Sequence, residues 1–244
     1  MSFRADPRPT RELARLGPVE QLRAGRLPRR LTQLVGGLVL YGLTLAMLIR
    51  GTLGNAPWDV LHQGLAEHLP IDIGTALIVV SFVVLLLWIP LRELPGLGTI
   101  ANAVLIGLAA DVFLALIDPP HALAARIALT VLGIGFNGLA TALYIGSQLG
   151  PGPRDGLMTG LHRRTGLSIR LVRTSMEVAV VAIGFVLGGT VGVGTLLYAL
   201  AIGPMVQLFL PYAIVELAAV VEVSRSEERA EWPRNPVTYP ETQA

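Results

Sequence analysis

The chain repeats itself at a fixed offset of 96 residues. Six residues around an aspartate recur in order: Gly54, Pro57, Asp59, Leu61, Gly64 and Leu65 return as Gly150, Pro153, Asp155, Leu157, Gly160 and Leu161. A second block recurs at the same offset: Gly96, Gly98, Thr99, Ile106 and Gly107 return as Gly192, Gly194, Thr195, Ile202 and Gly203. Aligning residues 37–114 with 133–210 needs no gap and gives 23 identities in 78 positions. Two separated blocks sharing one offset indicate a duplicated unit.

The composition favours a membrane protein. Hydrophobic residues make up 52% of the chain and charged residues 15%, and the mean hydropathy is +0.62, whereas soluble domains carry about 25% charged residues. The sequence has no cysteine, which excludes disulfides, thiolate metal sites and cysteine nucleophiles. Because the arginines cluster beside apolar segments, they indicate membrane topology and not a nucleic-acid surface.

Six apolar segments approach the roughly 20 residues that a membrane-spanning helix needs. They are residues 31–49, 71–90, 99–117, 122–145, 172–188 and 194–221. A shorter segment follows the first span of each unit, at residues 57–69 and 153–165. A helix of this length would be about 20 Å long, too short to cross the hydrocarbon layer. We therefore predict that each short helix is re-entrant or lies in the interface.

The number of spans per unit determines the symmetry. Three spans turn the second unit upside down relative to the first, whereas four would keep the units parallel. The four-span alternative places Arg154, Arg163 and Arg164 in lipid, at about 2.5 to 3.5 kcal/mol for a central arginine. We predict an all-α polytopic membrane protein with about six transmembrane helices, arranged as two inverted repeats of three with one short helix each.

This prediction divides the chain into four parts. Residues 1–30 form a basic cytoplasmic segment with eight arginines, and the following apolar run is a retained first span, since it lacks a clear cleavage site. The first membrane repeat covers residues 31–121 and the second covers 122–223. Residues 224–244 form a polar tail that is expected to be disordered and cytoplasmic.

The strongest local pattern is a proline followed two residues later by an aspartate, once in each unit. The candidate residues are Pro57, Trp58 and Asp59, with Pro153, Arg154 and Asp155. Proline at the first turn and an acidic residue beside it make a stable helix start. Alternatively, the two short-helix ends approach a shared centre and form a substrate or ion site. Duplication explains the recurrence under both interpretations.

Other polar residues lie within or beside the apolar segments. Asp111 corresponds to Gln207, and either a functional or an interfacial role fits it. Asn102 and Tyr198 are equivalent positions that either line a polar path or pack. Arg173 and Glu177 are spaced to form an ion pair on one helix face. Arg163, Arg164 and Arg170 are expected to determine topology and contact lipid.

The sequence gives little support for catalysis or cofactor binding. The Gly-x-Gly-Thr strings lack the lysine and spacing of a phosphate-binding loop. The four histidines show neither HExxH nor zinc spacing. No serine, histidine and carboxylate set lies at a credible site. We therefore expect no enzyme activity, no metal and no cofactor.

The repeated motifs resemble those of the YitT/YczE group of bacterial integral membrane proteins. The resemblance covers about residues 31–211 and rests on the Pro-Trp-Asp segment, Pro95-Gly96-Leu97-Gly98-Thr99, Pro-Gly-Pro-Arg-Asp-Gly at 151–156, and Gly192-Val193-Gly194-Thr195. Asn55-Ala56 departs from the glycine- and proline-rich approach of the group. The resemblance implies a multi-pass protein of the bacterial cytoplasmic membrane, and it implies no substrate and no catalytic residue.

Two functions remain open at this point. The first is a small secondary transporter or permease for an unknown small solute, with both termini cytoplasmic. The second is a non-transporting scaffold that binds a partner or anionic lipid through its cytoplasmic arginines. The glycines on the span faces permit a homodimer.

Overall fold

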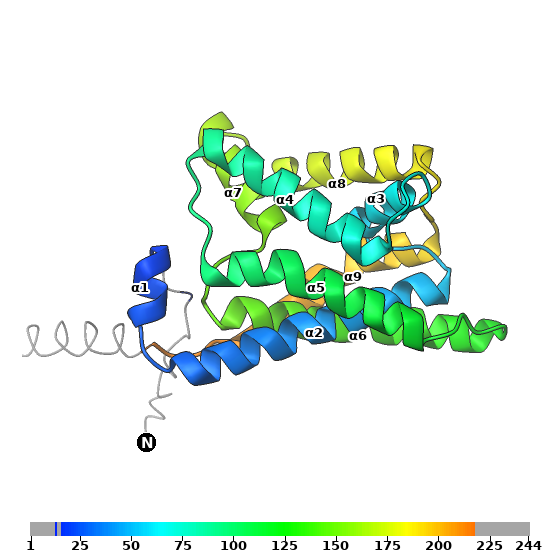
Figure 1. Cartoon of the computed structure of the whole chain (residues 1–244), viewed down its shortest axis with the longest axis horizontal. Helices are drawn as coiled ribbons and strands as arrows, with labels where there is room; N and C mark the ends of the chain where they lie inside the picture. The colour runs from blue at the N-terminus through cyan, green and yellow to red at the C-terminus, as the bar shows by residue number, and fades with distance from the viewer. Residues whose placement is uncertain (1–12, 14–15, 218–244) are drawn as a thin grey trace, which may run out of the picture.

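The computed structural model describes residue 13 and residues 16–217, and this part of the chain is helical, without strands. In Figure 1, α2, α5 and α6 lie in one layer and α3, α4, α7 and α8 in another. The helices are α1 (Pro18–Arg23), α2 (Leu27–Gly51), α3 (Pro57–Ala66), α4 (Ile73–Leu91), α5 (Leu97–Leu116), α6 (Leu123–Gly146), α7 (Pro153–Thr165), α8 (Ile169–Val186) and α9 (Val193–Ala213).

Five of these helices are long and apolar enough to cross a membrane: α2, α4, α5, α6 and α9. The predicted fifth span corresponds to α8, which is not among these five. It has 18 residues and carries Arg170, Arg173 and Glu177. The predicted sixth span was too long, because α9 ends at Ala213, just after Pro211. Beyond it the chain turns back, and the Val215 N–H donates to the Gly146 carbonyl at 3.0 Å. Residues 218–221 of that predicted span, and the polar tail, lie outside the described residues.

The order of helices recurs at the offset found in the sequence. The first residues of α2, α3, α4 and α5 are 27, 57, 73 and 97, and those of α6, α7, α8 and α9 are 123, 153, 169 and 193. Each helix of the first set therefore begins 96 positions before one of the second. The duplicated sequence accordingly folds into the same succession of long, short, long and long helices.

The long helices α2 and α6 pack against each other, and an arginine at the start of each binds the end of the other. Arg30 is fully buried; its Nε donates to the Ser147 carbonyl at 2.8 Å and its Nη2 to the Gln148 carbonyl at 2.6 Å. Arg126, 96 positions later, donates from Nε to the Gly51 carbonyl at 3.1 Å and from Nη2 to the Thr52 carbonyl at 3.2 Å. The two helices are therefore antiparallel neighbours, and each cation neutralises the carbonyl-rich end of the other helix.

The short helices pack against the long helices of the opposite half. Helix α3 lies against α8, and α7 lies against α4. At the second contact, Gly156 leaves room for the ring of Trp88, whose indole N–H donates to the Pro153 carbonyl at 2.9 Å. At the first contact, the backbone of α3 at Val60 approaches Gly184. Because each short helix packs on a helix of the other half, the two halves cannot separate without exposing both short helices.

Arg30 was expected to be one of a group of N-terminal topology arginines, but its burial indicates that it holds α2 against α6. Replacing it in Arg30→Ala leaves buried carbonyls unpaired, and hydrogen bonds to charged groups contribute about 1.5 to 3 kcal/mol each. We expect a clear drop in the thermal unfolding midpoint in detergent. Arg29→Ala, at the exposed neighbouring position, is the control and should leave the midpoint almost unchanged. Equal midpoints for both variants would contradict this role.

Candidate functional site

The loop before each short helix docks on the Gly-x-Gly-Thr turn of the opposite half. The Gly98 N–H donates to the Leu149 carbonyl at 2.6 Å, and the Gly194 N–H donates to the Leu53 carbonyl at 2.7 Å. The next residue in each loop, Gly54 or Gly150, has a φ of +117° or +123°, a conformation that favours glycine. The repeated motifs thus form two equivalent loop–turn contacts, one in each half. The starts of α3 and α7, which follow these loops, line a common cavity.

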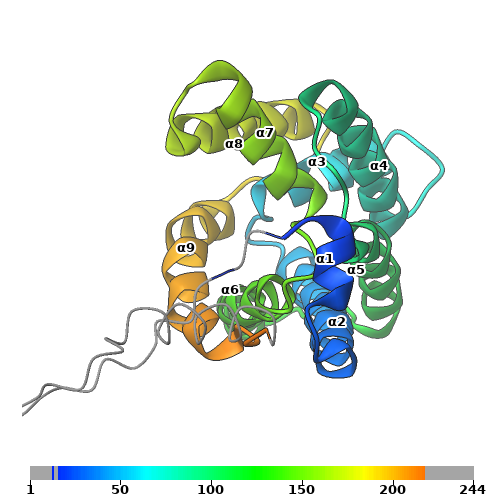
Figure 2. The ribbon, with the colours of Figure 1, turned by 90° about the vertical axis from the view of Figure 1, so that its left-hand side faces the viewer.

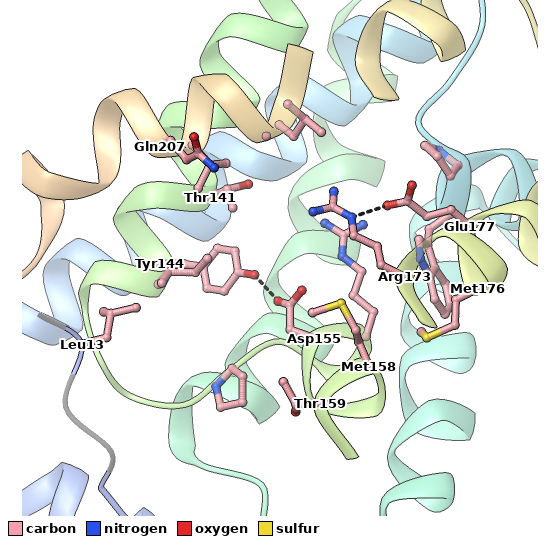
Figure 3. A pocket seen from close by; sticks show the side chains of 18 of the residues that line it. Leu13, Thr141, Tyr144, Asp155, Met158, Thr159, Arg173, Met176, Glu177 and Gln207 are labelled. Carbon is pink, nitrogen blue, oxygen red and sulfur yellow. Dashed lines mark hydrogen bonds and ion pairs between the residues drawn. The ribbon is translucent and has the colours of Figure 1, made fainter. Parts of the chain in front are cut away.

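A cavity of about 720 Å³ lies beside these helix starts. Figure 3 shows side chains of α6, α7, α8 and α9 around it. The start of α3 also contributes, through Pro57 and Trp58. The cavity wall includes Arg154, Asp155, Met158, Tyr144, Tyr198 and Ile202.

The wall of this cavity carries several polar contacts. Tyr144 donates its hydroxyl to Asp155 Oδ2 at 2.5 Å, and Arg173 Nε lies 2.9 Å from Glu177 Oε1; both contacts are drawn in Figure 3. The Arg173–Glu177 pair confirms the pairing predicted from their spacing. Tyr198 donates to Asn137 Oδ1 at 2.9 Å.

Arg154 lies in the first turn of α7. Its Nη2 donates to the hydroxyl of Tyr41, and its guanidinium carbon lies 5.6 Å from the centre of the Tyr41 ring. Together with Trp58 it lines both the large cavity and a second one of about 40 Å³. The second cavity also contains Asp59, whose Oδ1 lies 3.3 Å from His62 Nδ1.

The two cavities have equivalent walls in the two halves of the chain. Of the twelve residues that line the smaller cavity, all but Tyr41 and Val84 have a counterpart 96 positions away that lines the larger one. Asp59 corresponds to Asp155, Asn102 to Tyr198, and Trp58 to Arg154. Equivalent positions of the two halves thus surround two cavities of very different volume, one of about 720 Å³ and one of about 40 Å³.

The walls of the two cavities differ at one helix contact. Helices α4 and α5 pack together, with the Gly74 N–H donating to Asp111 Oδ1 at 2.7 Å and Thr75 Oγ1 lying 3.4 Å from Oδ2. The corresponding helices, α8 and α9, lie apart in Figure 2 and do not form an equivalent packed pair. Gln207, the counterpart of Asp111, lines the large cavity instead.

The sequence-predicted residues therefore separate into three groups. Those of the Pro-x-Asp segments, with Asn102 and Tyr198, all line at least one of the two cavities. Asp111 lies at the α4–α5 contact and lines neither of them. Of the topology arginines, Arg163 pairs with Glu93, Arg164 donates to the Pro90 carbonyl at 2.8 Å, and Arg170 is exposed.

Sequence reasoning missed the tyrosines that hold the charged residues. Tyr41 and Tyr144 lie within predicted spans and read as ordinary apolar-helix residues. Their position in the sequence gives no sign that they face Arg154 and Asp155, because these contacts join residues of different helices. His62 was dismissed as a metal ligand; in the structure it is buried, and its Nδ1 lies 3.3 Å from Asp59 Oδ1. Within the described part of the chain, no group of three or more histidine or acidic residues could hold a metal ion.

The fold and its apolar helices define a multi-pass α-helical membrane protein. The chain belongs to DUF6198, a family of unknown function, whose model matches residues 28–211. It is 43% identical to an uncharacterised protein of Haemophilus influenzae over 177 residues, which are 72% of this chain and 81% of that protein. It is 30% identical over 204 residues, 80% of this chain and 95% of the relative, to the uncharacterised membrane protein YczE of Bacillus subtilis. The resemblance to the YczE group is thereby confirmed. No solved structure matches the chain.

The Trp88–Gly156 contact fixes α7 and therefore Arg154. A Cβ built on Gly156 overlaps the indole ring of Trp88, so Gly156→Ala forces α7 away from α4, and overpacking of this kind costs about 1 to 3 kcal/mol. We expect a lower unfolding midpoint in detergent. The control is Gly135→Ala on α6, where a Cβ has open space and the helix gains propensity. A midpoint for Gly156→Ala equal to that of the control would contradict this contact.

Proposed function

We propose that this protein is a small secondary transporter or permease of the bacterial cytoplasmic membrane, which moves a small solute by alternating access. The observation that carries the proposal is the pair of equivalent cavities, one about 720 Å³ and the other about 40 Å³. Both include Trp58 and Arg154. A single central site that opens in turn through one wall and then through its repeat-related counterpart would have this form.

The proposed architecture is two inverted repeats with six crossings, α8 included. The reciprocal contacts of Arg30 and Arg126 support it, since equivalent helices α2 and α6 run in opposite directions. Helices α3 and α7 are then the short, discontinuous elements whose starts meet near the membrane midplane, as in many transporter folds.

The described conformation is proposed to be open to the cytoplasm. The large cavity reaches Leu13, Gln21 and Gln148, at the end of the molecule that carries α1. The basic N-terminal segment supports a cytoplasmic position for this end, because arginines are retained on the cytoplasmic side. In the opposite state α8 and α9 close together and the α4–α5 contact opens.

The alternative function is a scaffold that binds a partner or anionic lipid through Arg163, Arg164 and Arg170. It has less support, because the first two contact Glu93 and the Pro90 carbonyl of the same chain. Crosslinking with co-purification distinguishes the two functions. A stoichiometric partner that is lost when these arginines are neutralised would favour the scaffold.

Alternating access requires the α4–α5 contact to open, so a disulfide across this contact should block transport reversibly. The natural chain has no cysteine, so Thr75→Cys with Asp111→Cys places two thiols at the closed α4–α5 contact. In proteoliposomes tested with a panel of labelled organic acids, amino acids and sugars, we expect uptake that disappears on oxidation and returns on reduction. The cysteine-free parent, treated identically, is the control.

The repeat-related pair, Leu171→Cys with Gln207→Cys, should also form a disulfide, because these positions approach each other in the opposite state. Two results would count against the proposal: no uptake above empty vesicles for any solute, or a Leu171–Gln207 pair that never crosslinks while the Thr75–Asp111 pair does so fully.

A further inference from the structure

We propose that the large cavity binds an organic anion, a negatively charged group on an apolar body, with the guanidinium of Arg154 holding the negative group. This inference rests on the transport function proposed above and names the class of solute. Three observations support it. Arg154 has unused hydrogen-bond donors, the neighbouring carboxylates already have partners within the protein, and the rest of the wall is largely apolar.

Arg154 has more donors than its surroundings use. A guanidinium has five N–H donors, and among the described residues Arg154 makes one hydrogen bond, to the Tyr41 hydroxyl. The ring of Tyr41 adds a cation–π contact. A cation between membrane helices is costly unless it is paired. Because Arg154 lines both cavities, a ligand can reach its remaining donors.

The carboxylates of the cavity are already engaged. Asp155 accepts a hydrogen bond from Tyr144 at 2.5 Å and lies in the first turn of α7, where the helix end favours a negative charge. Glu177 is paired with Arg173. Among the described charged residues of this wall, Arg154 therefore has no ion-pair partner, and a planar guanidinium matches a carboxylate or phosphate in two parallel hydrogen bonds.

The rest of the wall suits an apolar body. Trp58, Met158, Met176, Ile202 and Val206 line the same cavity, and methionine side chains adapt to irregular apolar shapes. A volume of about 720 Å³ lies within the range of sites for drug-sized molecules and far exceeds the needs of a small inorganic ion. The first unit has no second arginine of this kind, because tryptophan occupies the position equivalent to Arg154.

An anionic group on an apolar body can come from solution or from the bilayer. The cavity is bounded by α8 and α9, which are not packed together, so a soluble organic acid and an anionic lipid share the required chemistry. The experiment therefore compares both sources in one preparation.

The test measures the affinity of 1-naphthoate for the full chain in nanodiscs of phosphatidylcholine. The neutral isostere 1-naphthamide tests the charge, and Arg154→Gln tests the residue. Arg163→Gln is the matched control, because it removes an arginine from the same helix whose side chain is 63% exposed and paired with Glu93. We expect 1-naphthoate to bind at least about tenfold more tightly than 1-naphthamide, and Arg154→Gln to remove this difference, since a charge-assisted hydrogen bond corresponds to roughly that ratio.

A second arm replaces part of the phosphatidylcholine by phosphatidylglycerol. Weaker naphthoate binding in wild type but not in Arg154→Gln identifies the lipid as an occupant, and unchanged binding identifies a soluble acid; both results support the anion site. Equal affinities of wild type for naphthoate and naphthamide overturn the inference, whether or not the variant folds. Preference for the anion that survives in Arg154→Gln overturns it as well. If naphthoate binds but the proteoliposomes take up none of the tested solutes, the transport proposal is contradicted and the anion site is still supported.

Discussion

The antiparallel contact between α2 and α6 is the constraint on which the rest of the structure depends. Each helix has an arginine in its first turn that binds carbonyls at the end of the other, Arg30 at one end and Arg126 at the opposite end. Helix ends carry unsatisfied carbonyls, and a cation there is favourable. With the two ends fixed, the loops that follow α2 and α6 must leave from opposite ends of the pair. Each loop then meets the Gly-x-Gly-Thr turn of the other half.

This arrangement has a direct consequence for the centre of the molecule. The short helices start at the docked loops and pack on the opposite halves, α3 on α8 and α7 on α4. Their starts therefore share one location, and the two cavities share Trp58 and Arg154. The two halves differ in structure where the side chains at one helix contact differ. Gly74 and Asp111 join α4 to α5, whereas Arg170 and Gln207 stand at the corresponding positions of α8 and α9.

Much of the helical framework could be predicted from the sequence, because apolar length and the repeat are local properties. Helix α7 has the predicted bounds, and α3 begins at Pro57 as predicted, although it ends at Ala66 and not at residue 69. Helix α9 ends at Ala213, and Val215 then forms a tertiary hydrogen bond with Gly146, which hydropathy does not contain. The sequence shows that Arg30 and Arg126 share the repeat offset, but neither their contacts with helix ends nor the burial of Arg30 follows from it. The tyrosine contacts of Arg154 and Asp155 and the unequal cavities arise from packing between distant segments, so a single sequence gives no sign of them.

Cysteine labelling at repeat-related positions tests most directly the proposal that the two halves face opposite sides of the membrane. Leu69 and Thr165 are exposed and differ by the repeat offset, and the cysteine-free chain gives no background. Single variants Leu69→Cys and Thr165→Cys would be treated in intact cells with a membrane-impermeant maleimide, before and after permeabilisation of the cytoplasmic membrane. The account predicts that Leu69→Cys reacts in intact cells and Thr165→Cys reacts only after permeabilisation. Labelling of both positions from the same side would contradict it.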